Sequence, residues 1–222
     1  MKNLIGILII LFAVFPLKAQ EVLLLPGQET QPLPGQEARF YYNQGNSCFD
    51  NGDMDRAIEY YNQAIASDPS DPNFWYNRGI AYFTTDQLDK AITDFSKTIA
   101  LDPDFSFAYI YRGVIFYLKD DQDRAINDFN NVLAMNPNDT FALGNRGNSY
   151  LAKDDFDKAI ADYNKVIALD PSIAEAWNNR GVAYLNKGEL DKAINDFNKA
   201  LELNPNYAEA KTNLEDATKA KK

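Results

Sequence analysis

The sequence contains no histidine and a single cysteine, Cys48, among its 222 residues. Without histidine, the chain lacks the usual general base for a serine or cysteine nucleophile and a common nitrogen ligand for metals. It also has no glycine-rich phosphate-binding or dinucleotide-binding motif. One cysteine cannot form an intramolecular disulfide, so the fold must be stabilised by packing. These absences argue against an enzyme, and we expect neither a cofactor nor a metal.

Basic residues are also few, since 22 lysines and arginines stand against 32 aspartates and glutamates, a formal net charge of -10. Nucleic acids bind to concentrated positive charge, so we expect no nucleic-acid partner. Two acidic pairs, Asp120-Asp121 and Asp154-Asp155, occur where turns are expected, and neither resembles a calcium-binding loop. We interpret them as turn and helix-capping residues.

The amino-terminal residues differ in kind from the rest. Met1-Lys2-Asn3 is followed by twelve uncharged, mostly apolar residues, 4–15, and the segment ends at the small residue Ala19. This pattern is typical of a secretory signal, and the apolar run is short for a transmembrane helix. We predict a signal peptide over residues 1–19 and export to the periplasm, the medium or the cell envelope. The alternative is an uncleaved anchor, the one case in which we expect membrane contact.

Residues 20–37 contain a duplicated phrase, Leu-Pro-Gly-Gln-Glu, at 25–29 and again at 33–37. Proline and glycine at this density favour a linker. The alternative is a short docking strip around Leu23, Leu24 and Leu25.

From residue 38 onward the sequence repeats every 34 residues, and a glycine and a proline each recur five times at that spacing. They are Gly45, Gly79, Gly113, Gly147 and Gly181, and Pro69, Pro103, Pro137, Pro171 and Pro205. A fixed period of this length indicates supersecondary units that bury their apolar faces by stacking on one another. We place five units at 38–71, 72–105, 106–139, 140–173 and 174–207.

Each unit contains two stretches with helical periodicity, such as 73–84 and 88–101 in the second unit. The prolines at the unit ends stop the second helix, because proline cannot continue a helix. Residues 208–222 begin like another first helix, but Glu215 stands in place of the glycine. We interpret this segment as a polar capping helix.

Six residue types at fixed offsets carry a family resemblance. They are Trp75, Gly79, Tyr82, Ala91, Phe95 and Pro103 in the second unit, and Trp177, Gly181, Tyr184, Ala193, Phe197 and Pro205 in the fifth. The pattern resembles the tetratricopeptide repeat, a helix-turn-helix of 34 residues. The resemblance implies an all-α, right-handed superhelical solenoid with a carboxyl-terminal capping helix.

Four units carry an arginine just before the glycine and an aspartate sixteen residues later. The first unit changes both positions, to Gln44 and Tyr60, which suggests that the two side chains touch. The alternative is an unpaired, solvated arginine. We predict ion pairs within the repeats: Arg78 with Asp94, Arg112 with Asp128, Arg146 with Asp162, and Arg180 with Asp196.

The resemblance also implies that the first helices line a concave groove that holds extended peptides. Amides at the sixth place of the units, Asn43, Asn77, Asn145 and Asn179, are suited to bond a peptide backbone. The alternative is that asparagine is merely frequent there. Aromatic residues predicted in the groove are Tyr42, Tyr76, Phe83, Phe107, Tyr111, Tyr117 and Phe141. They either bind the partner or pack against neighbouring first helices.

Together these features predict a non-catalytic, exported scaffold or adaptor that binds a partner protein or an extended peptide segment in its groove. Two alternatives remain open at this point. One is a membrane-anchored assembly factor, and the other is the regulatory subunit of a separately encoded enzyme.

Overall fold

The computed structural model describes residues 35–222, which contain eleven α-helices and no strand. The predicted signal peptide and most of the predicted linker lie outside the described residues. The described residues divide into two compact units, 35–112 and 113–222, which we call the N-terminal unit and the C-terminal unit. The all-α fold class predicted from the sequence is confirmed.

The helix bounds follow the repeat period. The helices are α1 (Glu37–Asp50), α2 (Met54–Ser67), α3 (Pro72–Thr84), α4 (Leu88–Leu101), α5 (Ser106–Leu118), α6 (Gln122–Met135), α7 (Thr140–Ala152), α8 (Phe156–Leu169), α9 (Ala174–Asn186), α10 (Leu190–Leu203) and α11 (Ala208–Ala220). The odd-numbered helices from α3 onward begin at the first residue of each predicted repeat or cap. Helix α1 begins one residue before the first predicted repeat.

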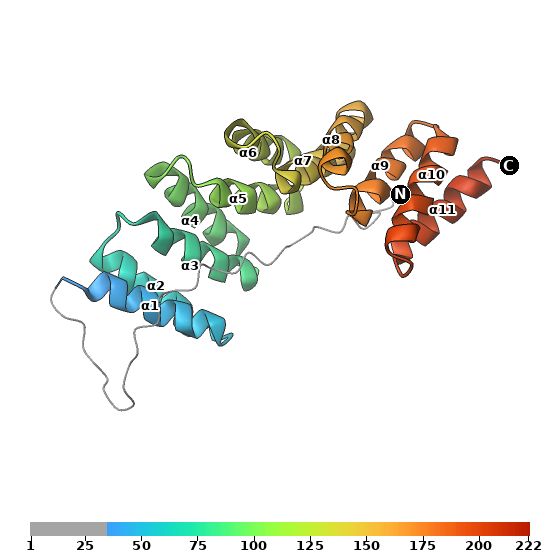
Figure 1. Cartoon of the computed structure of the whole chain (residues 1–222). Coiled ribbons are helices and arrows are strands. Elements are labelled where there is room, and N and C mark those ends of the chain that lie inside the picture. Colours follow the sequence, from blue (N-terminus) through green and yellow to red (C-terminus); the bar gives the residue numbers. More distant parts are fainter. Residues whose placement is uncertain (1–34) are drawn as a thin grey trace. The chain divides into compact units, whose positions relative to one another are not determined.

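Neighbouring helices form pairs, as Figure 1 shows. In the N-terminal unit α1 packs on α2, α2 on α3, and α3 on α4. In the C-terminal unit each helix from α6 to α11 packs on the next, and the first helices α7, α9 and α11 also contact one another in order. No helix within residues 35–222 is long and apolar enough to cross a membrane.

Each helix pair is closed by a ring of the second helix that covers the repeat glycine of the first. A Cβ added at Gly147 would lie 2.8 Å from the ring of Tyr163, a distance that real Cβ atoms do not adopt. Tyr163 is 1% exposed. The same contact joins Gly45 to Tyr61, Gly79 to Phe95, Gly113 to Phe129, and Gly181 to Phe197. The glycines therefore allow the two backbones to approach, and the rings fill the space between them.

The turn inside each repeat needs one residue with a left-handed backbone. These residues are Gly52, Asp86, Asp120, Asp154 and Gly188, with φ between 58° and 79°. Aspartate tolerates this conformation better than most other residues. After this turn Asp121 caps α6 by accepting a hydrogen bond from the backbone N–H of Arg124. The turn interpretation of the acidic pairs therefore fits the structure at Asp120, Asp121 and Asp154.

Helix α7 offers a matched pair of glycines. We expect Gly147→Ala to lower the free energy of unfolding by about 1–3 kcal/mol, because the added methyl group collides with the Tyr163 ring. We expect Gly144→Ala to raise it by about 0.5–1 kcal/mol, because a Cβ there meets no heavy atom within 4 Å and alanine favours the helix. Urea denaturation followed by circular dichroism measures both changes. Equal effects of the two substitutions would contradict the glycine–ring contact.

Candidate functional site

The candidate site is the surface of the first helices, which the sequence predicts as a binding groove. We call the side chains at the second and fifth places of the repeats and cap in each unit its first-helix face. In the N-terminal unit they are Arg39, Tyr42, Asn73, Tyr76, Phe107 and Ile110, and in the C-terminal unit Phe141, Gly144, Glu175, Asn178, Glu209 and Thr212.

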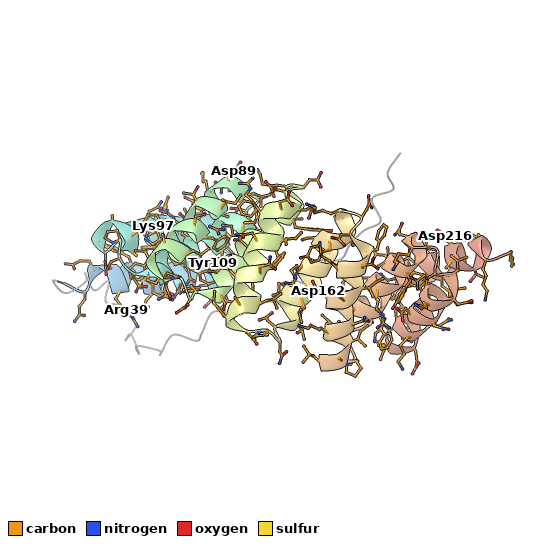
Figure 2. The ribbon with its side chains drawn as sticks, turned by 90° about the horizontal axis from the view of Figure 1, so that it is seen from above. Arg39, Asp89, Lys97, Tyr109, Asp162 and Asp216 are labelled. Atoms are coloured by element: carbon orange, nitrogen blue, oxygen red, sulfur yellow. The ribbon has the colours of Figure 1, made fainter. Side chains whose placement is uncertain are left out.

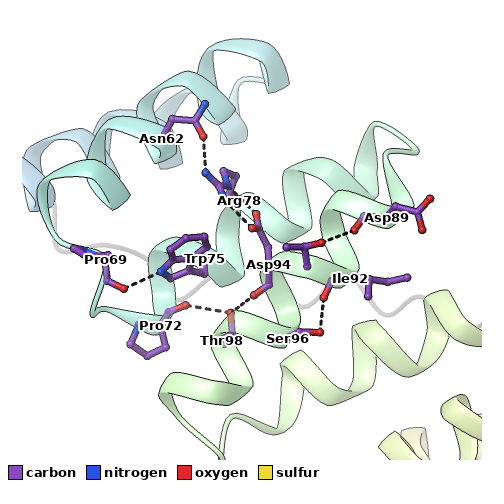
Figure 3. A network of polar contacts seen from close by, with 11 residues as sticks. Asn62, Pro69, Pro72, Trp75, Arg78, Asp89, Ile92, Asp94, Ser96 and Thr98 are labelled. Carbon is purple, nitrogen blue, oxygen red and sulfur yellow. Dashed lines mark hydrogen bonds and ion pairs between the residues drawn. The ribbon is translucent and has the colours of Figure 1, made fainter.

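The arginines at the seventh place join three helices. Arg78 on α3 donates from Nε and Nη2 to the two carboxylate oxygens of Asp94 on α4, at 2.8 and 2.7 Å. Its Nη1 donates to Asn62 Oδ1 on α2 at 2.6 Å, as Figure 3 shows. The arginine therefore joins its own helix pair by a bidentate, charge-assisted contact and connects this pair to the preceding repeat by one further hydrogen bond.

The C-terminal unit repeats this arrangement twice. Arg146 pairs with Asp162 and Arg180 with Asp196, at 2.6 and 2.8 Å. Their Nη1 atoms donate to Asn130 and Asn164 of the preceding second helices. Asp162, labelled in Figure 2, is 4% exposed. The hydrogen bond to Asp162 raises the pKa of Arg146.

Three of the four predicted ion pairs are thus formed within the repeats. Arg112 and Asp128 belong to different units, so the fourth pair stays a prediction. Within the N-terminal unit Arg112 donates to Ser96 Oγ at 2.9 Å. We did not predict the contacts of the arginines with the preceding repeat, although their acceptors recur every 34 residues. They are Asn62, Ser96, Asn130 and Asn164.

The predicted amides at the sixth place bond to the chain itself. Asn77 donates to the hydroxyl of Tyr42 and to Asn46 Oδ1, both at 2.9 Å. Asn145 donates to the backbone carbonyl of Phe141 at 2.9 Å. Asn179 donates to Asn148 Oδ1 at 3.0 Å. These three amides are buried, while Asn43 on α1 is half-buried. The structure therefore gives the buried amides a structural role, and peptide binding by them stays a prediction.

Two of these amides belong to a cluster that we did not predict. The hydroxyl of Tyr61 donates to Asn46 Oδ1 at 2.9 Å, and that of Tyr163 donates to Asn148 Oδ1 at 2.7 Å. We call Asn46, Tyr61 and Asn77, and likewise Asn148, Tyr163 and Asn179, the amide–tyrosine clusters.

The sequence carries a signal for these clusters. Asparagine stands at the ninth place only where the ring fifteen residues later is tyrosine. Where that ring is phenylalanine, the ninth residue is aliphatic: Ile80 with Phe95, Val114 with Phe129, and Val182 with Phe197. A buried hydroxyl needs a hydrogen-bond partner, whereas a buried phenyl ring needs an apolar neighbour.

Most predicted groove aromatics of the N-terminal unit pack between helices. The ring of Tyr42 lies 4.9 Å from that of Phe74, and the ring of Tyr76 lies 4.8 Å from that of Phe105. Tyr111 stacks on Phe95 at 5.7 Å, and Phe83 contacts it edge-on at 5.8 Å. Burial raises the pKa of Tyr42, Tyr76 and Tyr111. These four rings therefore pack inside the unit, and partner binding by them stays a prediction.

Phe107 behaves differently, because 42% of its surface is exposed. It lies on α5 one turn before Tyr111, so the two rings share a helix face. In the C-terminal unit Tyr117 and Phe141 are half-buried, and burial raises the pKa of Tyr117 to about 12. The structure therefore displays one large apolar side chain of the predicted set.

Comparisons with known proteins agree with this repeat geometry. The family model described as "Tetratricopeptide repeat" matches residues 72–105 and 174–207, and that described as "TPR repeat" matches 45–86 and 147–188. A crystal structure of MamA is 30% identical, with a TM-score of 0.70, over 74% of this chain and 96% of that chain. The chain belongs to the tetratricopeptide repeat family.

Other solved tetratricopeptide repeat proteins share the fold at lower identity. One from Parabacteroides merdae ATCC 43184 is 19% identical, with a TM-score of 0.78, over 84% of this chain and 74% of that chain. YrrB, described as having an unusual peptide-binding site, is 24% identical, with a TM-score of 0.73, over 81% of this chain and 93% of that chain. No curated protein matches the chain at a significant level.

The amide–tyrosine cluster of the C-terminal unit can be tested by substitution. We expect Asn148→Val to lower the free energy of unfolding by about 1–3 kcal/mol, because the buried hydroxyl of Tyr163 loses its acceptor. Adding Tyr163→Phe should recover part of this loss, because the ring then carries no hydroxyl, while the buried amide of Asn179 still lacks the Asn148 oxygen. Urea denaturation of both variants measures the recovery. A double variant no more stable than Asn148→Val would show that the hydroxyl and amide are not coupled.

Proposed function

We propose that the chain is an exported, non-catalytic scaffold or adaptor that binds an extended segment of a partner protein on its first-helix faces. The observation that carries the proposal is the exposure of Phe107 on the first-helix face of the N-terminal unit. The half-buried arginines of the repeats and the buried amides Asn77 and Asn179 are engaged in contacts between helices, and Asn145 is bonded to its own helix. Phe107, by contrast, leaves a large apolar ring in solvent.

An exposed aromatic ring beside packed rings is suited to binding another protein. Phe107 shares its helix face with Tyr111, whose ring is held by Tyr76, Phe83 and Phe95. A ring on such a rigid support binds a partner side chain with little loss of conformational entropy. Such partly exposed aromatic residues are common energetic centres of protein interfaces.

Export is supported by the sequence pattern of residues 1–19, which lie outside the described part of the structure. We expect the protein recovered from the periplasm or medium of exporting cells to begin at Gln20, because Ala19 ends the signal pattern. Amino-terminal sequencing of the recovered protein checks this expectation. A chain that keeps Met1 and sediments with membranes would instead favour a membrane-anchored assembly factor.

The binding function can be tested without a known partner. A library of random twelve-residue peptides is selected on the purified chain, and the affinities of selected peptides are measured by fluorescence anisotropy. For peptides bound by the N-terminal unit, we expect Phe107→Ser to weaken binding about tenfold or more, as for an interface centre.

A matched control is Leu203→Ser, because Leu203 is 36% exposed but ends a second helix, α10. We expect this variant to bind the same peptides as tightly as the unchanged chain. The proposal is wrong if no peptide is selected, or if the two variants affect the binding of every peptide equally.

A further inference from the structure

The two units contain the same repeat framework, three repeat periods apart. Trp75 Nε1 donates to the carbonyl of Pro69 at 3.0 Å, and Trp177 Nε1 donates to the carbonyl of Pro171 at 2.9 Å. Arg78 lies over the Trp75 ring at 4.9 Å, as Arg180 does over the Trp177 ring at 4.8 Å. The amide–tyrosine clusters recur at the same interval. Helices α1 to α4 and α7 to α10 therefore share these contacts, whereas Gln44 and Tyr60 stand at the positions of the Arg146–Asp162 pair.

The first-helix faces are not equivalent. On the N-terminal face the ring of Tyr42 packs at a tilt against the buried ring of Phe74, and the corresponding residues of the C-terminal unit are Gly144 and Ala176. Phe107 corresponds to Glu209. The N-terminal face thus carries three aromatic residues, whereas the C-terminal face carries one aromatic residue, Phe141, together with a glycine and two glutamates. The internal packing leaves the Phe107 ring exposed and the space beside Gly144 open, so both positions are available to a partner.

Gly144 is the clearest example of a residue that the internal packing does not require. A Cβ at this position meets no heavy atom within 4 Å, although glycine weakens a helix interior. Gly147 on the same helix, by contrast, is covered by the Tyr163 ring. A glycine beside open space lets the backbone of a bound segment approach closely.

Two carboxylates lie on the same face. Glu175 on α9 and Glu209 on α11 are half-buried at the second places of neighbouring first helices, which pack together. Burial raises the pKa of Tyr207, the negative charges of Glu209 and Glu175 raise it further, and a side-chain hydrogen bond joins this hydroxyl to Glu209. Burial also raises the pKa of Glu209.

No cation within residues 35–222 forms an ion pair with either carboxylate. Lys219 on α11 is instead paired with Asp216 at 3.6 Å and with Glu215 at 3.9 Å. The chain as a whole carries a net charge of -10, which adds to the attraction for a cationic segment. Charge complementarity therefore points to a basic partner.

We infer that the first-helix face of the C-terminal unit binds an extended partner segment that places a lysine or arginine side chain between Glu175 and Glu209. The backbone of this segment passes over Gly144, where the equivalent Tyr42 ring would block it. The inference rests on the proposed function and specifies the partner of the second unit. The chain then offers two docking faces of different chemistry.

The peptide selection described above tests this inference when peptides are sorted by the face that they require. We expect one class of selected peptides to be enriched in lysine and arginine over the library. The double substitution Glu175→Gln and Glu209→Gln should weaken binding of this class about tenfold or more, because charge-assisted contacts are lost. Gly144→Tyr should weaken it similarly, whereas Phe107→Ser should leave its affinity unchanged.

Several outcomes overturn the inference. They are the absence of a class rich in lysine and arginine, and affinities of that class that do not respond to the double glutamine substitution. Circular dichroism of each variant establishes that it is folded. If Gly144→Tyr unfolds, the double glutamine variant still tests the inference, because glutamine preserves the side-chain size of glutamate. Peptides that respond only to Phe107→Ser would overturn the inference and retain the proposed function, whereas a selection without binders would overturn both.

Discussion

Each helix pair of this protein depends on a ring of the second helix that lies directly on a glycine of the first. A Cβ in place of any repeat glycine would come within 2.6 to 2.9 Å of that ring. The contact sets the distance between the paired helices and thereby aligns the other contacts of the repeat. Arg78, beside Gly79, can then reach Asp94 on the second helix and its acceptor Asn62 on the preceding one.

The polar residues of the repeats follow from this close packing. A buried tyrosine hydroxyl needs an acceptor, and Asn148 supplies it for Tyr163. Asn179 of the next repeat donates to the same oxygen. Residues that resemble members of a peptide-binding groove thus hold neighbouring repeats together. We therefore propose the partner-binding role for other side chains, such as Phe107 in one unit and the Glu175 and Glu209 pair in the other.

The 34-residue period made much of the fold predictable from the sequence. Proline and glycine at fixed spacing located the helix starts, and the joint change to Gln44 and Tyr60 pointed to the arginine–aspartate pairs. Both signals concern helices and contacts inside one repeat. They are visible in the sequence because the same positions recur in each copy.

The candidate site was less predictable, because its residues depend on contacts between repeats. Whether Asn77 faces a partner or donates to Asn46 depends on the ninth residue of the preceding repeat. Whether an aromatic ring is exposed depends on its neighbours, so Tyr76 is packed while Phe107 is not. The paired change of asparagine with tyrosine was visible in the sequence and would have located the clusters.

The most direct test of this account is a nuclear Overhauser measurement between glycine Hα protons and aromatic ring protons in the intact chain. The account predicts a cross-peak from each repeat glycine to the ring sixteen residues later, including Gly147 to Tyr163, and none from Gly144 to any ring. Missing cross-peaks at the repeat glycines, or an equally strong one at Gly144, would contradict the contact on which the repeats depend.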